Sequence, residues 1–220
     1  MQPIRLHHVA ARAIVLCAAI AAGGCAALSE GETARYFVLE AGTTAGAVSA
    51  APAARPSVLV APTSASGFYD TQDIVYSRVP GMRAYYQFSH WTERPQRAIH
   101  AELASRLDTG GRRDGLELVT HLEEIYHDAA EPPGRARITL AAELLRADSR
   151  AVLARRSFSQ SAPATSYDAP GAVQGFRKAL GALLDEVATW VADQAPPPAP
   201  PRAAPPAQKP VRDRRQEPGP

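Results

Sequence analysis

An apolar stripe at helical spacing occupies residues 171–191 and strongly limits what this chain can fold into. Large apolar side chains return every three or four residues along it. They are Val173, Phe176, Leu180, Leu183, Leu184, Val187, Trp190 and Val191. Polar side chains such as Gln174, Lys178 and Asp185 lie off the stripe. The pattern predicts a helix packed on a sheet; the alternative is a helix on a membrane surface, which would favour a more basic polar face.

Three segments before this helix alternate apolar and polar residues, as half-buried strands do. They are LELVTHL (116–122), RITLAAELL (137–145) and AVLARRSF (151–158). The ADSR sequence at 147–150 predicts a hairpin turn, so the last two strands should pair in antiparallel fashion. The pair Glu123-Glu124 interrupts the alternation of the first segment and predicts a bulge or a strand end.

The first half of the folded region contains shorter strand candidates. They are residues 34–40, 57–61, 73–78 and 84–90. The sequence Val79-Pro80-Gly81 predicts a turn that pairs the last two of them. A helix should begin at Pro95 and end near Leu107, with Thr92 as its N-cap and Glu93 near its positive end. The expected fold is a single α+β domain, a mostly antiparallel sheet with two main helices packed on it.

The N-terminus resembles a bacterial lipoprotein signal. Two arginines precede the apolar run Ala13–Ala22, which ends in AGGC with Cys25 last. By this resemblance, residues 1–24 are a signal peptide and residues 25–32 a lipidated linker, although Ala22 stands where Leu is usual. The alternative is an ordinary secretory signal cleaved after a small residue. Position two of the mature chain, Ala26, is not Asp, which favours the periplasmic face of the outer membrane.

Composition then divides the rest of the chain. Residues 33–194 form the expected domain, and residues 195–220 form a Pro-rich tail that should be extended and disordered. That tail holds five basic and two acidic residues, and the mature chain as a whole holds 22 of each. A neutral-to-acidic body argues against nucleic acid as its partner.

No pattern in the sequence predicts catalysis, a cofactor or a metal site. The GxSxG, P-loop, HExxH and CxxC motifs do not occur. His121 and His127 are expected on one strand face but about 20 Å apart, too far to bind one metal ion. Glu93 has Asp70 and Asp73 as conceivable carboxylate partners, although nothing local brings them together. We therefore expect a protein that is not an enzyme.

The sequence SHWTERP (89–95) sets an acid, a base, an aromatic ring and a guanidinium side by side. We interpret it as a structural corner between a strand and a helix. Trp91 would anchor the corner, Pro95 would start the helix, and His90 and Arg94 would bind backbone carbonyls or a nearby carboxylate.

Several motifs occur in an order that is similar to the ABC-type transport auxiliary lipoproteins, the family of the paraquat-inducible protein C lipoprotein. They are the lipobox, Tyr36-Phe37-Val38-Leu39, Val58-Leu59-Val60-Ala61-Pro62, the set Asp70, Ile74, Val75, Tyr76 and Arg78, and the corner Trp91, Glu93 and Pro95. The resemblance covers residues 13–40 and 57–107 well and 116–194 only by pattern.

The resemblance implies a docking or scaffold subunit of a transport system that moves phospholipid or other hydrophobic molecules between inner and outer membranes. Its partners would be an MCE-domain protein with its permease and ATPase, and self-association is left open. The family signature and candidate partner interface comprises Phe68, Tyr69, Asp70, Asp73, Ile74, Tyr76, Arg78, His90, Trp91, Glu93, Arg94 and Pro95.

Two further interpretations remain from the sequence. The chain is also compatible with a structural lipoprotein of another outer-membrane assembly, or with a carrier that binds lipid in its own cavity. The aromatic side chains Phe68, Tyr69, Tyr85 and Tyr86 are compatible with a place in the sheet core and with an exposed interface.

Overall fold

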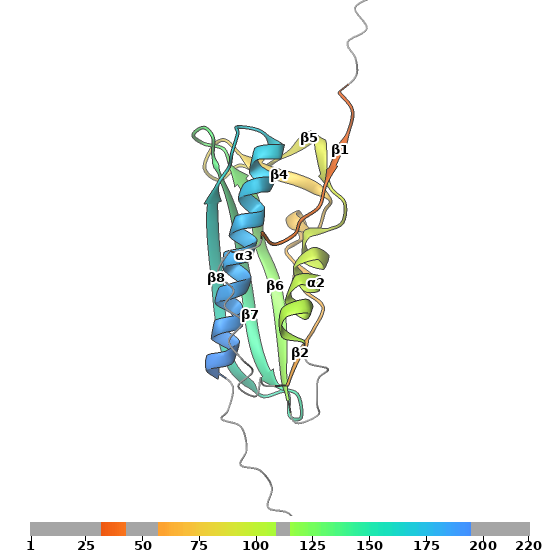
Figure 1. The fold of residues 1–220 in the computed structure, drawn as a ribbon, viewed down its shortest axis with the longest axis vertical. Coiled ribbons are helices and arrows are strands. Elements are labelled where there is room, and N and C mark those ends of the chain that lie inside the picture. Colours follow the sequence, from red (N-terminus) through yellow and green to blue (C-terminus); the bar gives the residue numbers. More distant parts are fainter. Residues whose placement is uncertain (1–31, 43–56, 109–114, 195–220) are drawn as a thin grey trace, which may run out of the picture.

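Three long antiparallel strands form the centre of the molecule: β6 (Leu116–Asp128), β7 (Arg135–Arg146) and β8 (Val152–Pro163) (Figure 1). The computed structural model describes residues 32–42, 57–108 and 115–194. Cys25, the signal segment and the Pro-rich tail lie outside the described residues. The three strands start and end close to where the alternating patterns predict, although β6 and β8 extend further toward the C-terminus than expected.

Five short strands complete the sheet. They are β1 (Arg35–Phe37), β2 (Val58–Val60), β3 (Ser64–Ala65), β4 (Asp73–Ser77) and β5 (Ala84–Trp91). The strands β2, β3 and β4 follow one another along the edge of β6 that β7 leaves free, and each pairs with it in parallel. β5 pairs with β4 in antiparallel fashion and β1 pairs with β5 in parallel, so the order is β1-β5-β4-β6-β7-β8.

The α+β fold expected from the sequence is confirmed, with one refinement to the sheet. The long ladders β6–β7 and β7–β8 and the β4–β5 hairpin are antiparallel. The four short pairings that attach β1, β2, β3 and β4 are parallel, so the sheet is mixed. Short strands with loops between them can turn back along one edge of β6, and local alternation carries no information about that direction.

The helices α2 (Pro95–Leu107) and α3 (Ala169–Gln194) cover the same face of the sheet (Figure 1). α3 lies across β7 and β8, and every residue of its expected apolar stripe is buried. α2 lies beside β2 and β6, and an ion pair of 2.6 Å between Arg106 and Asp185 joins the two helices. A short 3-10 helix, η1 (Gly67–Tyr69), precedes β4.

Strand β7 shows how the sheet meets the helices. Ile138, Leu140, Ala142 and Leu144 are almost fully buried beneath them. The residues between them, such as Thr139 and Glu143, are half-buried on the opposite face. Burying one face of an antiparallel sheet under helices and leaving the other partly in solvent is the arrangement that the alternation predicts.

The irregularity expected at Glu123-Glu124 is a β-bulge, since the register of β6 against β7 shifts between Leu122 and Glu124. The bulge adds one residue to the alternation. His121 therefore remains half-exposed while His127 turns into the interior and is fully buried. The expectation that these two histidines share a strand face was wrong for this reason.

The start of α2 differs in one detail from the expectation. Pro95 occupies the first helical turn, as predicted, but Arg94 rather than Thr92 takes the N-cap position and makes no side-chain cap. The residue before a proline avoids helical backbone angles, and Arg94 is extended with ψ of 134°. Thr92 and Glu93 thus belong to the connection between β5 and the helix.

Trp91 ends β5 with a side chain that is only 1% exposed, and its ring meets the edge of Phe176 from α3 at 5.5 Å. We predict that Trp91→Ala lowers the free energy of unfolding by about 3–5 kcal/mol, because it leaves a large cavity between sheet and helix. Met82→Ala is the control, since Met82 is 63% exposed and its loss should cost less than about 0.5 kcal/mol. Chemical denaturation measures both, and equal stabilities would contradict the buried position of Trp91.

Candidate functional site

Five family-signature residues meet at the corner where β5 turns into α2, next to the segment between η1 and β4. They are Asp70, Asp73, His90, Trp91 and Arg94. Backbone hydrogen bonds hold the two segments together: the Trp91 N–H donates to the Gln72 carbonyl at 2.6 Å, and the Thr92 N–H donates to the Phe37 carbonyl at 2.8 Å. The Gln72 side-chain amide donates to the carbonyls of Trp91 and Thr92. The corner is thus tied to both β1 and the η1–β4 connection.

Two carboxylates of the signature bind the polar residues of the corner. His90 Nδ1 lies 2.9 Å from Asp73 Oδ1, and the Arg94 guanidinium donates to Asp70 Oδ1 at 3.0 Å. The Gln96 amide donates to the same Asp70 oxygen at 2.6 Å. The expectation that His90 and Arg94 bind a nearby carboxylate is confirmed.

These contacts also separate Asp70 and Asp73 from Glu93, the third acidic residue of the signature. Asp70 and Asp73 each bind a basic partner, whereas Glu93 is exposed on the connection to α2. The structure does not bring Glu93 and either aspartate together as a carboxylate pair. The amides of Gln72 and Gln96, which the sequence analysis did not single out, complete the corner; only their place beside the signature motifs could have indicated them.

The aromatic residues near the signature separate into a buried and an exposed group. Tyr69 is 7% exposed, and its hydroxyl accepts a hydrogen bond from Arg83 Nε at 3.1 Å. Burial raises the pKa of Tyr69 above its usual value. Arg83 also lies 3.7 Å from the centre of the Tyr126 ring and pairs with Glu124. Through Arg83, the buried Tyr69 is thus linked to residues of strand β6.

Phe68 and Tyr85 form the exposed group. Their rings are stacked with centroids 5.0 Å apart and an angle of 14° between the planes, and each side chain is 42% exposed. The Tyr85 hydroxyl donates to the Phe68 carbonyl at 3.4 Å, which fixes the two segments against each other. Among the four aromatic residues considered from the sequence, Tyr69 therefore lies in the core, whereas Phe68 and Tyr85 are exposed and remain candidates for an interface.

Tyr76 and Arg78 lie apart from the corner, around the buried His127. The Arg78 guanidinium lies 5.2 Å from the centre of the Tyr76 ring and 6.0 Å from that of Tyr167. The Tyr86 ring is tilted against Tyr76 at 4.7 Å. Ile74, in the same strand, is fully buried in the core. The signature segment thus contributes to three places: the corner, the core and this cluster.

His127 makes two hydrogen bonds that define its tautomer. Nε2 lies 3.0 Å from the Pro133 carbonyl, which only accepts, so Nε2 carries the proton. Nδ1 therefore accepts from the Tyr86 hydroxyl at 2.7 Å. Burial lowers the pKa of His127 and raises the pKa of Tyr86 to about 12, so both groups are held in their neutral forms.

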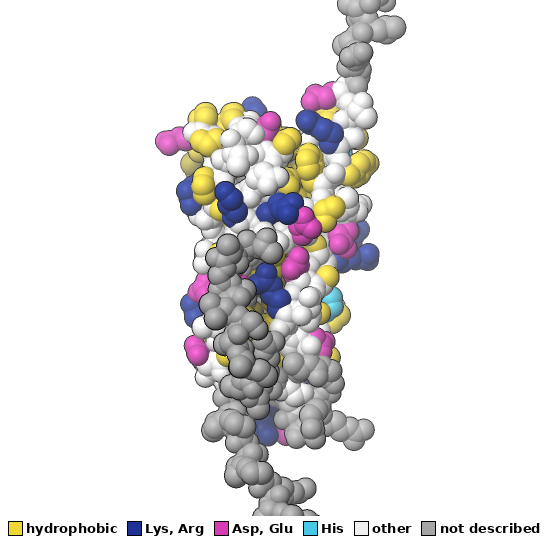
Figure 2. Space-filling model, in the orientation of Figure 1, with side chains coloured by type: hydrophobic (Ala, Val, Ile, Leu, Met, Phe, Trp, Pro, Cys, Tyr) yellow, Lys and Arg dark blue, Asp and Glu magenta, His cyan; other side chains and the backbone are white. Residues whose placement is uncertain are grey.

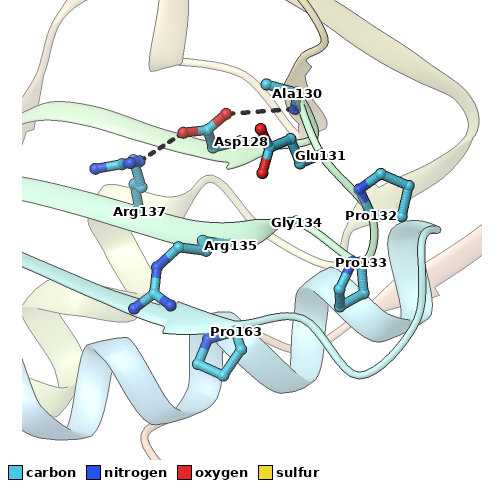
Figure 3. A pocket seen from close by; sticks show the side chains of 9 residues that line it. All are labelled: Asp128, Ala130, Glu131, Pro132, Pro133, Gly134, Arg135, Arg137 and Pro163. Carbon is cyan, nitrogen blue, oxygen red and sulfur yellow. Dashed lines mark hydrogen bonds and ion pairs between the residues drawn. The ribbon is translucent and has the colours of Figure 1, made fainter.

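A hollow of about 370 Å³ lies beside this cluster, at the turn between β6 and β7 (Figure 3). Asp128 in its wall binds Arg137 at 2.9 Å, and Arg135 binds Ser161 on β8. Prolines form much of the rest of the wall. Asp128, Arg135 and Arg137 in this lining are therefore already hydrogen-bonded within the protein, which leaves them less available to a substrate.

Two observations concern the described residues as a whole. Within 32–42, 57–108 and 115–194, no three His, Cys, Asp or Glu side chains come close enough together to hold a metal ion. Neither α2 nor α3, the helices of these ranges, combines the length and apolar character that crossing a membrane requires.

Comparison with known proteins identifies relatives by sequence and by fold. A family model described as ABC-type transport auxiliary lipoprotein component matches residues 37–188. A crystal structure from Xanthomonas campestris, of a protein assigned to the family DUF330, has a similar fold with a TM-score of 0.62. It shares 20% identity, and the match covers 73% of this chain and 96% of that one. No protein with a curated description matches the sequence.

A second crystal structure, of an uncharacterized protein, matches with a TM-score of 0.56 and 12% identity. That match covers 73% of this chain and 99% of the other. At these identities, the two structures establish a shared fold.

Gly134 and Gly81 allow a matched test of the packing around His127. Both have positive φ, +85° for Gly134 and +80° for Gly81. A Cβ on Gly134 would clash with His127 Nε2, whereas a Cβ on Gly81 would meet nothing within 4 Å. We predict that Gly81→Ala costs about 1 kcal/mol from backbone strain alone. Gly134→Ala should cost about 1–3 kcal/mol more because it overpacks the site. Equal losses in denaturation experiments would contradict this packing.

The lowered pKa of His127 predicts a pH dependence of stability. Below pH 6.5 His127 binds a proton in the unfolded state but stays neutral in the folded state until the pH falls further. The free energy of unfolding that His127 contributes above pH 6.5 is therefore lost as the pH falls. The slope contributed by this group is at most about 1.4 kcal/mol per pH unit. His127→Gln should reduce the slope between pH 7.5 and 5.5 measured by denaturation. A His121→Gln variant controls for removing a histidine elsewhere, and an unchanged slope in His127→Gln would refute the assignment.

Proposed function

The chain belongs to the ABC-type transport auxiliary lipoprotein family, and we propose that it is a non-enzymatic docking subunit of such a transport system in the cell envelope. In this proposal the partner is an MCE-domain protein with its permease and ATPase. The cargo is a phospholipid or another hydrophobic molecule that passes between the inner and outer membranes. Cys25 carries the lipid anchor and holds the domain on the periplasmic face of the outer membrane.

The stacked pair Phe68 and Tyr85 is the observation that best supports a docking role. Both rings are 42% exposed, although each lies next to well-packed structure. Solvent-exposed aromatic rings on a rigid frame bind partners at low entropic cost, because little side-chain freedom remains to be lost. The rings therefore offer a preformed surface to a partner protein.

The frame beneath these rings is held by polar contacts that are already satisfied. Arg83 donates to the Tyr69 hydroxyl, the Tyr69 ring meets the Phe68 ring edge to face, and Asp70 accepts from Arg94 and Gln96. Because these groups have partners, they support the corner rather than react with a substrate. This arrangement favours a binding surface over a catalytic centre.

A lipid-carrying role has weaker support from the described residues. An acyl chain needs an apolar cavity, whereas the hollow at the β6–β7 turn contains Asp128, Glu131, Arg135 and Arg137 (Figure 3). The apolar side chains between sheet and helices instead pack on one another, with rings such as Phe158 and Trp190 in edge contact at 5.5 Å. We therefore place the contact with the cargo in the partner and not in this domain.

Site-specific photo-crosslinking in cells tests the proposal. A photoreactive amino acid at position 85 of the tagged full-length chain should crosslink an MCE-domain protein, which mass spectrometry identifies. Phe68→Ser combined with Tyr85→Ser should lower co-purification of that partner about tenfold or more, the loss expected from an interface hot spot. Val152→Ser is the matched control, because Val152 is 43% exposed at the other end of the sheet.

A further variant, examined in the same experiment, distinguishes the role of the lipid anchor from that of the docking surface. Cys25→Ala should abolish acylation and release the domain into the periplasm, with the Phe68–Tyr85 surface intact. Recovery of a different outer-membrane assembly without any MCE component would overturn the proposed transport role. Unchanged co-purification in the double variant, with an unchanged melting temperature, would move the docking surface elsewhere.

A further inference from the structure

Three turns meet at one end of the sheet, which we call the anchor end. They are the β4–β5 turn (78–83), the β6–β7 turn (129–134) and the β8–α3 connection (164–168). The Ala129 N–H donates to the Ser77 carbonyl at 2.7 Å, and the Tyr167 hydroxyl donates to the Ala129 carbonyl at 2.6 Å. These contacts join the turns into one surface.

The described chain enters at the same end. β1 runs parallel to β5, which begins directly after the β4–β5 turn, so both strands start toward the anchor end (Figure 1). The pKa of Asp168 is lowered mainly by hydrogen bonds that the carboxylate accepts from Ser166 and Gly171. The positive charge of Arg35, the first residue of β1, lowers it further, so Arg35 lies near Asp168. Glu32, the first described residue, precedes β1 by three positions.

The tether from the proposed lipid to this end is short. Glu32 follows Cys25 by seven positions, so the intervening chain spans at most about 25 Å even when fully extended. β6 has 13 residues and is therefore about 40 Å long from the far end to the anchor end. A lipid on Cys25 thus holds the anchor end, rather than the far end, near the bilayer.

The β4–β5 turn carries an apolar tip at this end. Val79 is 52% and Met82 63% exposed, and Pro80 between them is exposed as well. The turn contains no acidic residue, and the exposed Arg78 stands at its base against tyrosine rings. Figure 2 shows hydrophobic side chains at the upper end of the molecule, with both basic and acidic side chains around them. Apolar groups with an arginine behind them match the acyl boundary and the phosphates of a bilayer surface.

We propose that the β4–β5 turn is a second membrane contact, in which Val79 and Met82 insert at the headgroup–acyl boundary of the bilayer that holds the anchor, with Arg78 at the level of the phosphates. The proposal rests on the Cys25 anchor of the proposed function. This contact gives the domain a defined orientation, in which the anchor end of the sheet faces the bilayer. A single lipid tether alone would leave the orientation free.

In this orientation the C-terminal end of α3 points away from the bilayer. α3 starts at the anchor end and runs away from it over 26 residues, or about 39 Å (Figure 1). Its last residue, Gln194, then faces away from the bilayer that holds the anchor.

Depth-dependent quenching on vesicles tests the contact. The acylated full-length chain has no cysteine besides the lipidated Cys25 once the signal is removed, so Met82→Cys can take an environment-sensitive fluorophore. The protein is reconstituted on vesicles of phosphatidylethanolamine and phosphatidylglycerol that contain a shallow spin-labelled lipid. Leu153→Cys is the matched control, an apolar side chain that is 44% exposed on β8 at the far end.

We expect the probe at position 82 to be quenched about twofold or more compared with the probe at position 153, since insertion of several Å brings it to the spin label. Equal, weak quenching of both probes on protein that floats with the vesicles would overturn the membrane contact and leave the anchor standing. Failure of the wild-type chain to float would overturn the anchor and this proposal together.

Discussion

The burial of α3 against β7 and β8 is the interaction on which the rest of the structure depends. The helix approaches so closely that a Cβ on Gly175 would lie 3.0 Å from the Ala136 side chain. Phe176 on the same helix reaches across to Trp91, the last residue of β5. The helix therefore connects the long antiparallel strands to the short strands along the other side of β6, and it places the corner after Trp91 in a fixed position.

That fixed position explains why the signature corner contains groups that resemble catalytic residues. Asp70 pairs with Arg94, and Asp73 is hydrogen-bonded to His90; these contacts join segments that are separated by about twenty residues in the chain. The exposed rings of Phe68 and Tyr85 then lie next to segments that hydrogen bonds join to each other. A docking subunit benefits from such a support, since ordering a loose surface would weaken binding.

The two ends of the sheet differ in which parts of the chain lie there. The end where β1 begins carries exposed apolar side chains on the β4–β5 turn, and the end of α3 lies at the opposite end. Tyr85 follows Met82 by three positions, so the docking surface lies next to the membrane contact. A partner bound to Phe68 and Tyr85 would therefore contact the domain close to the bilayer that holds the anchor.

The sequence by itself determined the elements whose signal is local: the stripe of α3, the alternation of β7, the start of α2 at Pro95 and the interruption at Glu123-Glu124. These follow from periodicity and backbone sterics, which act over a few residues. Only the tertiary structure decided that β2, β3 and β4 run parallel along β6, that Asp73 meets His90, and that Phe68 is exposed while Tyr69 is buried. It also decided that His127 faces the core, because one extra residue in the bulge reverses every later side chain. Those outcomes depend on partners distant in sequence, which no local pattern encodes.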